Sequence, residues 1–561
     1  MDAYLKDSLD KIYGEKDDFI IIGLTGRTGS GCTTVASILS QEKEMINHSL
    51  YNGTSPVTNE DRKERILYSY FDVNWCKFLS IKVSSIITLM LSDEKLDEIK
   101  EFISNFNESQ GSIVNSKAID SVIDELSQIK QKKKQIKKNK SYKTLVDFYS
   151  SYIDEKTKNI SELVERSWYT LFYQKIGRNI RMSGSAINES LINGKFISLS
   201  IKIANVIKEI RKLSKGENEK TFVVIDAIRN PLEALYFQER YASFYLMAVS
   251  CDDTDRVKRL EKLGYDSESI AKLDANEGVD KELSENDGYF NQDIPSCLQR
   301  ADIYLNNAGF CPGGNFSKDK LSNQLIKFIS LIRRPGLVTP SAMERCMQIA
   351  YTAKLNSGCI SRQVGAIITD ENYSVQAVGW NDTPKGQVPC NLRCRKDLHR
   401  KTDVSAFSKF ELTNEGYRKH QDLKIAKLSA LARKGLHASY CFKSEYNKFT
   451  GKDNQVHTRS LHAEENAFLQ ASKYGGRGIE GGKLFTTASP CELCAKKAYQ
   501  LGIKEIYYID RYPGISESHI LMGGAFNPQL ILFTGAIGRA FHNLYSPLIP
   551  YKDESNALMN C

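Results

Sequence analysis

Three residues toward the carboxyl end of the chain have the types and spacing of metal ligands. HAEEN begins at His462, and SPCELC spans 489–494, giving H-x-E followed by P-C-x-x-C. One imidazole and two thiolates can hold Zn²⁺ tetrahedrally and leave its fourth position to water. Zinc lowers the pKa of such a water, and a neighbouring carboxylate that does not bind the metal can then carry protons. The predicted zinc ligands are His462, Cys491 and Cys494. Glu464 is the predicted proton carrier.

A closed structural zinc site is the alternative to this catalytic interpretation. Such a site needs four protein ligands. No further cysteine or histidine stands at a fixed short spacing from the motif. The open, catalytic arrangement is therefore favoured.

The second half of the chain alternates helices and strands around this motif. His462 and Glu464 begin one predicted helix, and the two cysteines begin another, where the helix dipole favours thiolates. This alternation predicts an α/β/α sandwich around one mixed sheet. The predicted helices are 340–355, 462–473 and 491–501, and the predicted strands are 364–370, 374–380, 483–488 and 505–510.

Residues 336–540 resemble the deoxycytidylate deaminases of the cytidine deaminase superfamily. Beyond H-x-E and P-C-x-x-C, the similarity lies in SGCISRQVGAII (357–368) and GWNDTP (379–384). It implies zinc-dependent deamination of dCTP or dCMP by a homo-oligomer. It also implies that Asn381 binds the deoxyribose and that Tyr512 closes over the nucleotide. A plain turn residue remains the alternative for Asn381.

A long insertion separates GWNDTP from HAEEN, and it contains CNLRCRKDLHR and a helix-like stretch at 404–434. Cys390, Cys394 and His399 could form most of a second, structural zinc site, as in some viral members of the family. The alternative is a lid-like insertion with ordinary thiols.

The amino-terminal stretch GRTGSGCT has the outline of a phosphate-binding loop between a buried strand and a helix. Its glycines let backbone N–H groups face an anion at the helix N-terminus, and Thr33 could hold Mg²⁺. Cys32 replaces the lysine that phosphoryl transfer requires. We therefore expect nucleoside triphosphate binding without kinase chemistry. The predicted binding residues are Gly26, Arg27, Gly29, Gly31 and Thr33.

The first half resembles P-loop nucleotide kinases. VVIDAIRNP ends a predicted strand with Asp226 as a metal or substrate carboxylate, and Arg256 and Arg259 match lid arginines of that class. A buried strand, a glycine-rich turn and a helix are predicted over 19–40, and further strands are predicted at 244–250 and 300–307. A parallel sheet covered by helices on both faces is the expected fold.

Length and composition set the domain organisation. The 561 residues exceed one core, so we predict a domain over 1–335, with an insertion at about 60–215, and a second over 336–561. The absence of an apolar run of 18 residues and of a signal-peptide pattern predicts a cytoplasmic protein that does not contact the membrane. The 13 cysteines favour metal binding and buried thiols over disulfides.

The net charge of +9 is unevenly placed, with eight lysines within 130–143. This segment is either a solvated helix face or a surface for a polyanion such as RNA.

A degenerate P-loop half joined to a deoxycytidylate deaminase half resembles the bacterial antiphage deoxycytidylate deaminases. That resemblance implies depletion of deoxycytidine nucleotides, restrained by a regulatory RNA. Two other functions compete with it: an RNA- or single-stranded-DNA-editing cytidine deaminase, and a nucleotide sensor with a relic zinc site. The intact Glu464 disfavours the sensor.

Overall fold

The computed structural model divides the chain into two compact units: Met1–Thr339 with Arg539–Cys561, and Pro340–Gly538. The predicted boundary at 335 lies close to this division. Residues 539–561, however, group with the first unit and not with the second domain as predicted. The structure describes residues 8, 11, 13, 14, 17–138, 140–217, 219–278, 290–307, 318–452, 454, 456–473, 479–511 and 514–559.

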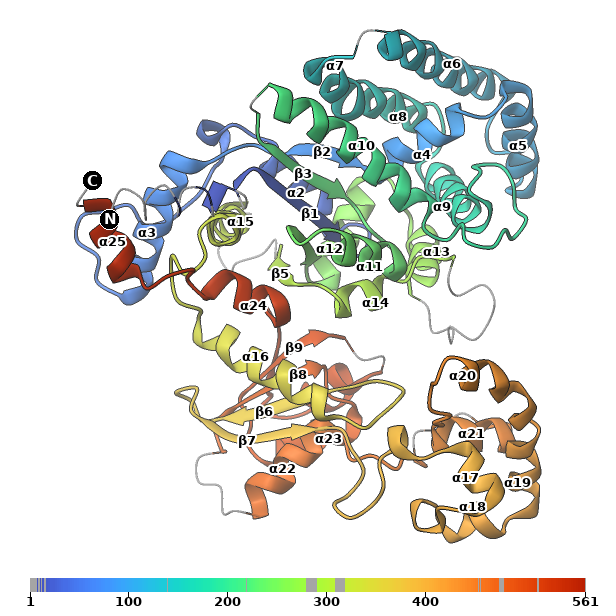
Figure 1. Cartoon of the computed structure of the whole chain (residues 1–561), viewed down its shortest axis with the longest axis vertical. Coiled ribbons are helices and arrows are strands. Elements are labelled where there is room, and N and C mark those ends of the chain that lie inside the picture. The colour runs from blue at the N-terminus through green and yellow to red at the C-terminus, as the bar shows by residue number, and fades with distance from the viewer. Residues whose placement is uncertain are drawn as a thin grey trace. The chain divides into compact units, whose positions relative to one another are not determined.

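The first unit contains five parallel strands in the order β5-β4-β1-β3-β2 (Figure 1). β1 reads FIIIGLT and buries every residue, as a central strand covered on both faces must. Gly23 pairs with Ile225, so β1 and β3 end at the same edge of the sheet. The strands are β1 (Phe19–Thr25), β2 (Leu79–Lys82), β3 (Thr221–Asp226), β4 (Phe244–Ser250) and β5 (Ile303–Asn306).

The insertion predicted at 60–215 is largely helical, and the short strand β2 lies within it. Helices α4 to α10 pack on one another there, around side chains such as Ile129 and Phe148. The helices of this unit are α2 (Cys32–Leu39), α3 (Asn59–Asn74), α4 (Val83–Ser92), α5 (Leu96–Ser109), α6 (Ser116–Lys138), α7 (Tyr142–Asp147), α8 (Ile153–Glu162), α9 (Arg166–Ser183), α10 (Ser198–Gly216), α11 (Pro231–Arg240), α12 (Asp253–Lys262), α13 (Ser267–Glu277), α14 (Ile294–Gln299), α15 (Lys318–Arg333), α24 (Gly538–Tyr545) and α25 (Tyr551–Met559).

The lysine-rich segment falls mainly on α6. Lys133 pairs with Asp93, and Lys130 donates to the Glu94 carbonyl at 2.7 Å. Lys132, Lys134, Lys137 and Lys138 are exposed. In the part of the chain that the structure describes, no helix is both long and apolar enough to cross a membrane.

The second unit contains the predicted mixed sheet, in the order β10-β9-β8-β6-β7. β6 is antiparallel to β7 and β8, whereas β8, β9 and β10 are parallel. α16 (Ala342–Ala353) and α22 (Ala463–Lys473) lie on opposite faces of this sheet (Figure 1). The strands are β6 (Gly365–Thr369), β7 (Val375–Trp380), β8 (Lys483–Ala488), β9 (Glu505–Asp510) and β10 (Gln529–Leu532), and the two-residue β11 (Gly535–Ala536) follows.

Small residues bring α22 close to the sheet. Ala366 and Ile368 of β6 face the same apolar cluster as Ala463 and Ala467 of α22. Gly379 of β7 allows the closest approach, since a Cβ there would lie 2.2 Å from the Ala463 carbonyl oxygen and 2.5 Å from the Ala467 nitrogen. The same cluster includes residues of α23 (Glu492–Gln500).

The insertion of the second unit folds into short helices around buried ion pairs. Arg393 and Glu411 form an ion pair with no solvent exposure, and the Tyr440 hydroxyl donates to Glu411 at 2.6 Å. The helix-like stretch expected at 404–434 is broken into several pieces. The helices are α17 (Arg395–Arg400), α18 (Lys409–Thr413), α19 (Glu415–Asp422), α20 (Ser429–Arg433) and α21 (Phe442–Thr450).

Gly379→Ala is expected to displace α22 and lower the free energy of unfolding by about 1–3 kcal/mol, because an added methyl group overlaps helix backbone atoms. The variant should also lose bound zinc, although residue 379 is not a predicted ligand. Thermal denaturation and metal analysis measure the two effects. Gly216→Ala is the matched control, since its Cβ would meet nothing within 4 Å. Unchanged stability in the residue 379 variant would contradict this description of the packing.

Candidate active site and glycine-rich loop

The three predicted zinc ligands come together in the second unit. Leu461 donates its N–H to the Asp382 carbonyl at 2.8 Å, so the chain enters α22 beside the end of β7, with His462 directly before the helix. Cys491 caps the amino end of α23, and Cys494 lies in its first turn.

The distances between these ligand atoms fit a single zinc ion. His462 Nδ1 lies 3.3 Å from Cys491 Sγ and 3.5 Å from Cys494 Sγ. Tetrahedral zinc, with bonds of about 2.3 Å to sulfur and about 2.0 Å to nitrogen, separates such atoms by roughly 3.5 Å. Among the described residues, no other group of three histidine, cysteine, aspartate or glutamate side chains has all its ligand atoms within 4.8 Å of one another.

The electrostatics of the group favour a thiolate. Hydrogen bonds from Cys494 and His462 lower the pKa of the Cys491 thiol to about 4, despite its burial. The position of Cys491 at a helix N-terminus favours negative charge as well. A thiolate is the form in which cysteine binds metal.

Glu464 lies in the first turn of α22, is 4% exposed and is not a member of the three-ligand group. Burial raises the pKa of its carboxyl. The Thr486 hydroxyl of β8 lies 3.1 Å from its Oε1 and 2.8 Å from the Ala488 carbonyl oxygen. Thr486 was not predicted, because nothing in KLFTTA distinguishes this threonine from its neighbour.

Asn381 has internal partners for both side-chain atoms. Its Oδ1 accepts the Val364 N–H at 2.6 Å, and its Nδ2 donates to the Arg362 carbonyl at 2.8 Å. The side chain therefore fixes the backbone that leads into β6, in addition to any contact with a sugar. Tyr512, the predicted aromatic cover, lies outside the described residues.

Cys390, Cys394 and His399 do not form the predicted second metal group. They are all described, yet their ligand atoms do not gather within 4.8 Å. His399 Nδ1 instead pairs with Asp422 at 2.8 Å on the surface. His399 lies in α17, which begins after Cys394, and its partner Asp422 belongs to α19.

The predicted phosphate-binding loop lies between β1 and α2 in the first unit. Gly29 has φ +88° and Gly31 has φ +110°, the left-handed region that glycine adopts without strain. Cys32 is buried, and burial raises the pKa of its thiol to about 12, so it carries no charge at neutral pH. Thr33 hydrogen-bonds to the buried Asp226 carboxylate at the end of β3.

Charged partners hold this loop from outside. Arg27 pairs with Asp253 at 2.8 Å and Asp274 at 2.9 Å, so its guanidinium group has internal partners where a phosphate contact was predicted. The buried Glu277 carboxylate accepts the Thr28 N–H at 3.0 Å.

The two arginines predicted as lid residues also contact the loop. Arg256 donates to the Thr28 carbonyl at 3.3 Å, and Arg259 donates to the Gly29 carbonyl at 3.4 Å. Both side chains therefore support the loop's backbone in this structure.

Comparison with known proteins decides the family of the second unit. Residues 340–510 match the cytidine and deoxycytidylate deaminase zinc-binding region. The deoxycytidylate deaminase of Enterobacteria phage T4 is 30% identical over 166 residues, which cover 30% of this chain and 76% of the phage protein. The chain belongs to the cytidine and deoxycytidylate deaminase family. It is therefore a deaminase with a Zn²⁺-binding region, as predicted.

Two further deaminases are similar to this chain. The deoxycytidylate deaminase of Schizosaccharomyces pombe is 27% identical over 197 residues, covering 34% of this chain and 44% of the yeast protein. A crystal structure of the cyanophage S-TIM5 dCMP deaminase with dCMP and dUMP matches 35% of this chain and 99% of its own, with 24% identity and a TM-score of 0.22.

Proposed function

We propose that the protein hydrolytically deaminates free deoxycytidine nucleotides, converting dCTP, dCMP or both to dUTP and dUMP. The buried Glu464 carboxyl, held by Thr486 next to the His462, Cys491 and Cys494 group, is the observation that carries this proposal. The similarity to proteins named deoxycytidylate deaminases supports the substrate class.

The mechanism assigns a separate task to each group. Zinc held by His462, Cys491 and Cys494 would supply the positive charge that acidifies a water molecule. Glu464 would take the two protons of the attacking water in turn and pass one to the cytosine ring nitrogen and the other to the departing amine. Oxygen is thereby added at C4, and ammonia leaves. Burial raises the pKa of Glu464, which suits a group that must gain and release a proton.

A deaminase that edits RNA or single-stranded DNA is the competing function, because the zinc motif is common to both classes. The lysines exposed on α6 would suit a polyanionic substrate. The deaminases to which this chain is similar carry the names of enzymes for a free nucleotide, and this favours the first proposal.

We also propose a physiological setting. The resemblance to antiphage deaminases supports depletion of the deoxycytidine nucleotide pool by a cytoplasmic homo-oligomer. A regulatory RNA would contact the exposed lysines of α6. The glycine-rich loop of the first unit would bind a nucleoside triphosphate, with Mg²⁺ at Thr33, and control the deaminase.

The purified protein is expected to release ammonia from dCTP or dCMP and to leave a cytosine-containing oligonucleotide unchanged. Uracil formation in parallel incubations of the three substrates measures this preference. Removal of zinc by a chelator should abolish turnover. Deamination of the oligonucleotide with none of the free nucleotides would overturn the proposal in favour of editing.

The glycine-rich loop is expected to bind a nucleoside triphosphate without hydrolysing it, since the neutral Cys32 cannot replace the charge that phosphoryl transfer needs. Gly31→Ala should abolish binding, because a Cβ would lie 2.0 Å from Asn307 Nδ2 at a left-handed φ. Equilibrium binding and phosphate release measure the two properties, with Gly216→Ala as the control. Hydrolysis that disappears in Thr33→Ala would show an active NTPase instead.

A further inference from the structure

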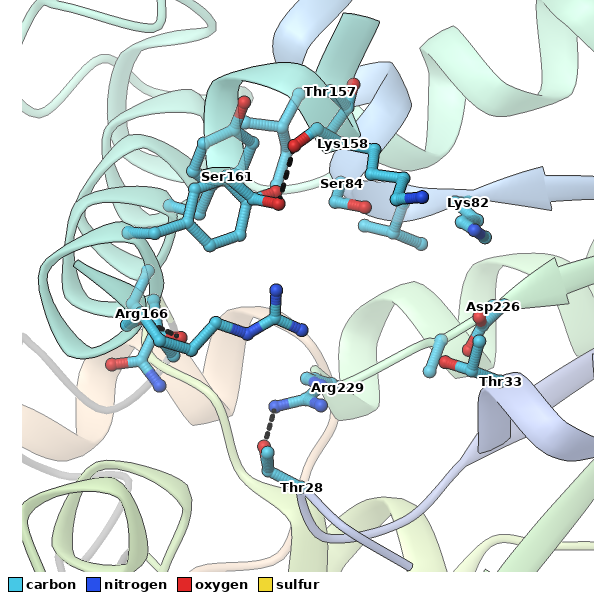
Figure 2. Close-up of a pocket in the computed structure, with 18 of the residues that line it drawn as sticks. Thr28, Thr33, Lys82, Ser84, Thr157, Lys158, Ser161, Arg166, Asp226 and Arg229 are labelled. Carbon is cyan, nitrogen blue, oxygen red and sulfur yellow. Dashed lines mark hydrogen bonds between the residues drawn. The ribbon is translucent and has the colours of Figure 1, made fainter. Parts of the chain in front are cut away.

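The glycine-rich loop of the first unit is in contact with an anionic side chain of the chain itself. The Thr28 N–H donates to Glu277 Oε2 at 3.0 Å, and the Thr28 hydroxyl donates to the same carboxylate. Arg229 Nη1 lies 2.5 Å from Glu277 Oε1 and 2.8 Å from the Thr28 hydroxyl oxygen, and Figure 2 shows this second contact. A backbone N–H, a hydroxyl and a guanidinium group are donors that proteins offer to phosphate, yet here all three bind one carboxylate.

Glu277 carries its charge into a space from which water is largely excluded. Its side chain is only 1% exposed, and a buried charge is screened much less than one at the surface. Its ion pair with Arg229 presents no net charge to an incoming anion. A phosphate group at the Thr28 N–H would lie directly against the carboxylate, and like charges repel strongly when they are buried. Phosphate and Glu277 therefore cannot occupy this part of the loop together.

Glu277 is the last residue of α13, and the rest of this helix is attached to the loop as well. Asp274, one turn earlier, pairs with Arg27 at 2.9 Å. Arg256 of α12 pairs with Asp274 at 2.8 Å and donates to the Thr28 carbonyl at 3.3 Å. An apolar cluster joins α12 to α13. Departure of Glu277 from the loop would therefore shift α13 and disturb the contacts of α12.

We propose that Glu277 is an internal competitor of phosphate, which closes the glycine-rich loop until a nucleoside triphosphate displaces it and moves α13 off the loop. Such competition presupposes that the loop binds a triphosphate, as proposed above. Only molecules in which Glu277 has left the loop can bind, and the apparent affinity is lowered by the fraction that they represent. Occupancy of the loop is thereby converted into a change in the position of α12 and α13.

Glu277→Gln tests this competition by equilibrium binding of ATP and GTP, with Mg²⁺, to the full chain. Glutamine keeps the size of the side chain and an accepting oxygen but removes the charge. Affinity is expected to rise about tenfold or more, because the repulsion disappears and the Arg229 charge becomes available. Glu268→Gln is the matched control and should leave affinity unchanged, since Glu268 is an exposed residue of the same helix that pairs with Lys272 at 2.8 Å. Adding Gly31→Ala to Glu277→Gln should abolish binding and so place the increase at the loop.

Hydrogen exchange of the unmodified protein is an independent test that needs no substitution. ATP or GTP, at a concentration that occupies the loop, is expected to speed amide exchange in α13, because the helix loses the contacts that hold it on the loop. A helix that closed over a bound nucleotide would instead exchange more slowly.

Each of four results would overturn the proposal. Nucleotides that bind Glu277→Gln no more tightly than the unmodified protein would mean that the loop binds a triphosphate without competition from Glu277. An increase in affinity that survives Gly31→Ala would place the ligand elsewhere. Slower exchange in α13 on nucleotide binding would contradict displacement of the helix. Absence of binding in both proteins would remove the proposed triphosphate binding as well. A thermal denaturation profile of Glu277→Gln that matches the unmodified protein establishes that a changed affinity is not changed folding.

Discussion

The close packing of α22 against β7 is the constraint on which the active site depends. His462 and Glu464 stand at the start of this helix, and its backbone approaches the strand only because residue 379 has no side chain. Asn466 adds a hydrogen bond of 2.9 Å from its Nδ2 to the Trp380 carbonyl. The same apolar cluster joins α22 to α23, which carries the two cysteines. The distance between imidazole and thiolates is therefore fixed by the core of the unit.

In the first unit, ion pairs and hydrogen bonds hold the glycine-rich loop in position, whereas in the second unit close packing positions the predicted zinc ligands. The glycine-rich loop has no lysine. Its own Arg27 pairs with Asp253, Arg256 donates to the Thr28 carbonyl, and Glu277 accepts the Thr28 N–H. These contacts stabilise the conformation of the loop. Residues of α4, α8 and α9 in the helical insertion line a cavity beside this loop.

The sequence alone was enough to predict those site residues whose positions follow from local spacing along the chain. H-x-E and P-C-x-x-C each fall at a helix start, so the motif alone indicated His462 and Cys491 as ligands. Buried strands such as β1 and β8 were predictable from continuous apolar runs. β2 and β10 were not predicted, because each is four residues long and only partly buried.

Contacts between residues distant in the chain were not predictable. Glu277 meets Thr28 across 249 positions, and no local pattern marks that pairing. The internal partners of Asn381 likewise depend on how β7 returns beside β6. The separation of Cys390 and His399, which were predicted to share a second metal, was likewise not predictable, since the direction of a side chain depends on where each short helix begins.

Zinc content and dCMP turnover, measured together in two variants, test the central claim most directly. That claim is that His462, Cys491 and Cys494 hold the metal while Glu464 only moves protons. Glu464→Ala is predicted to keep one zinc per chain and lose turnover, whereas Cys491→Ala is predicted to lose both. Equal loss of zinc in the two variants would contradict the account, because it would make Glu464 a ligand.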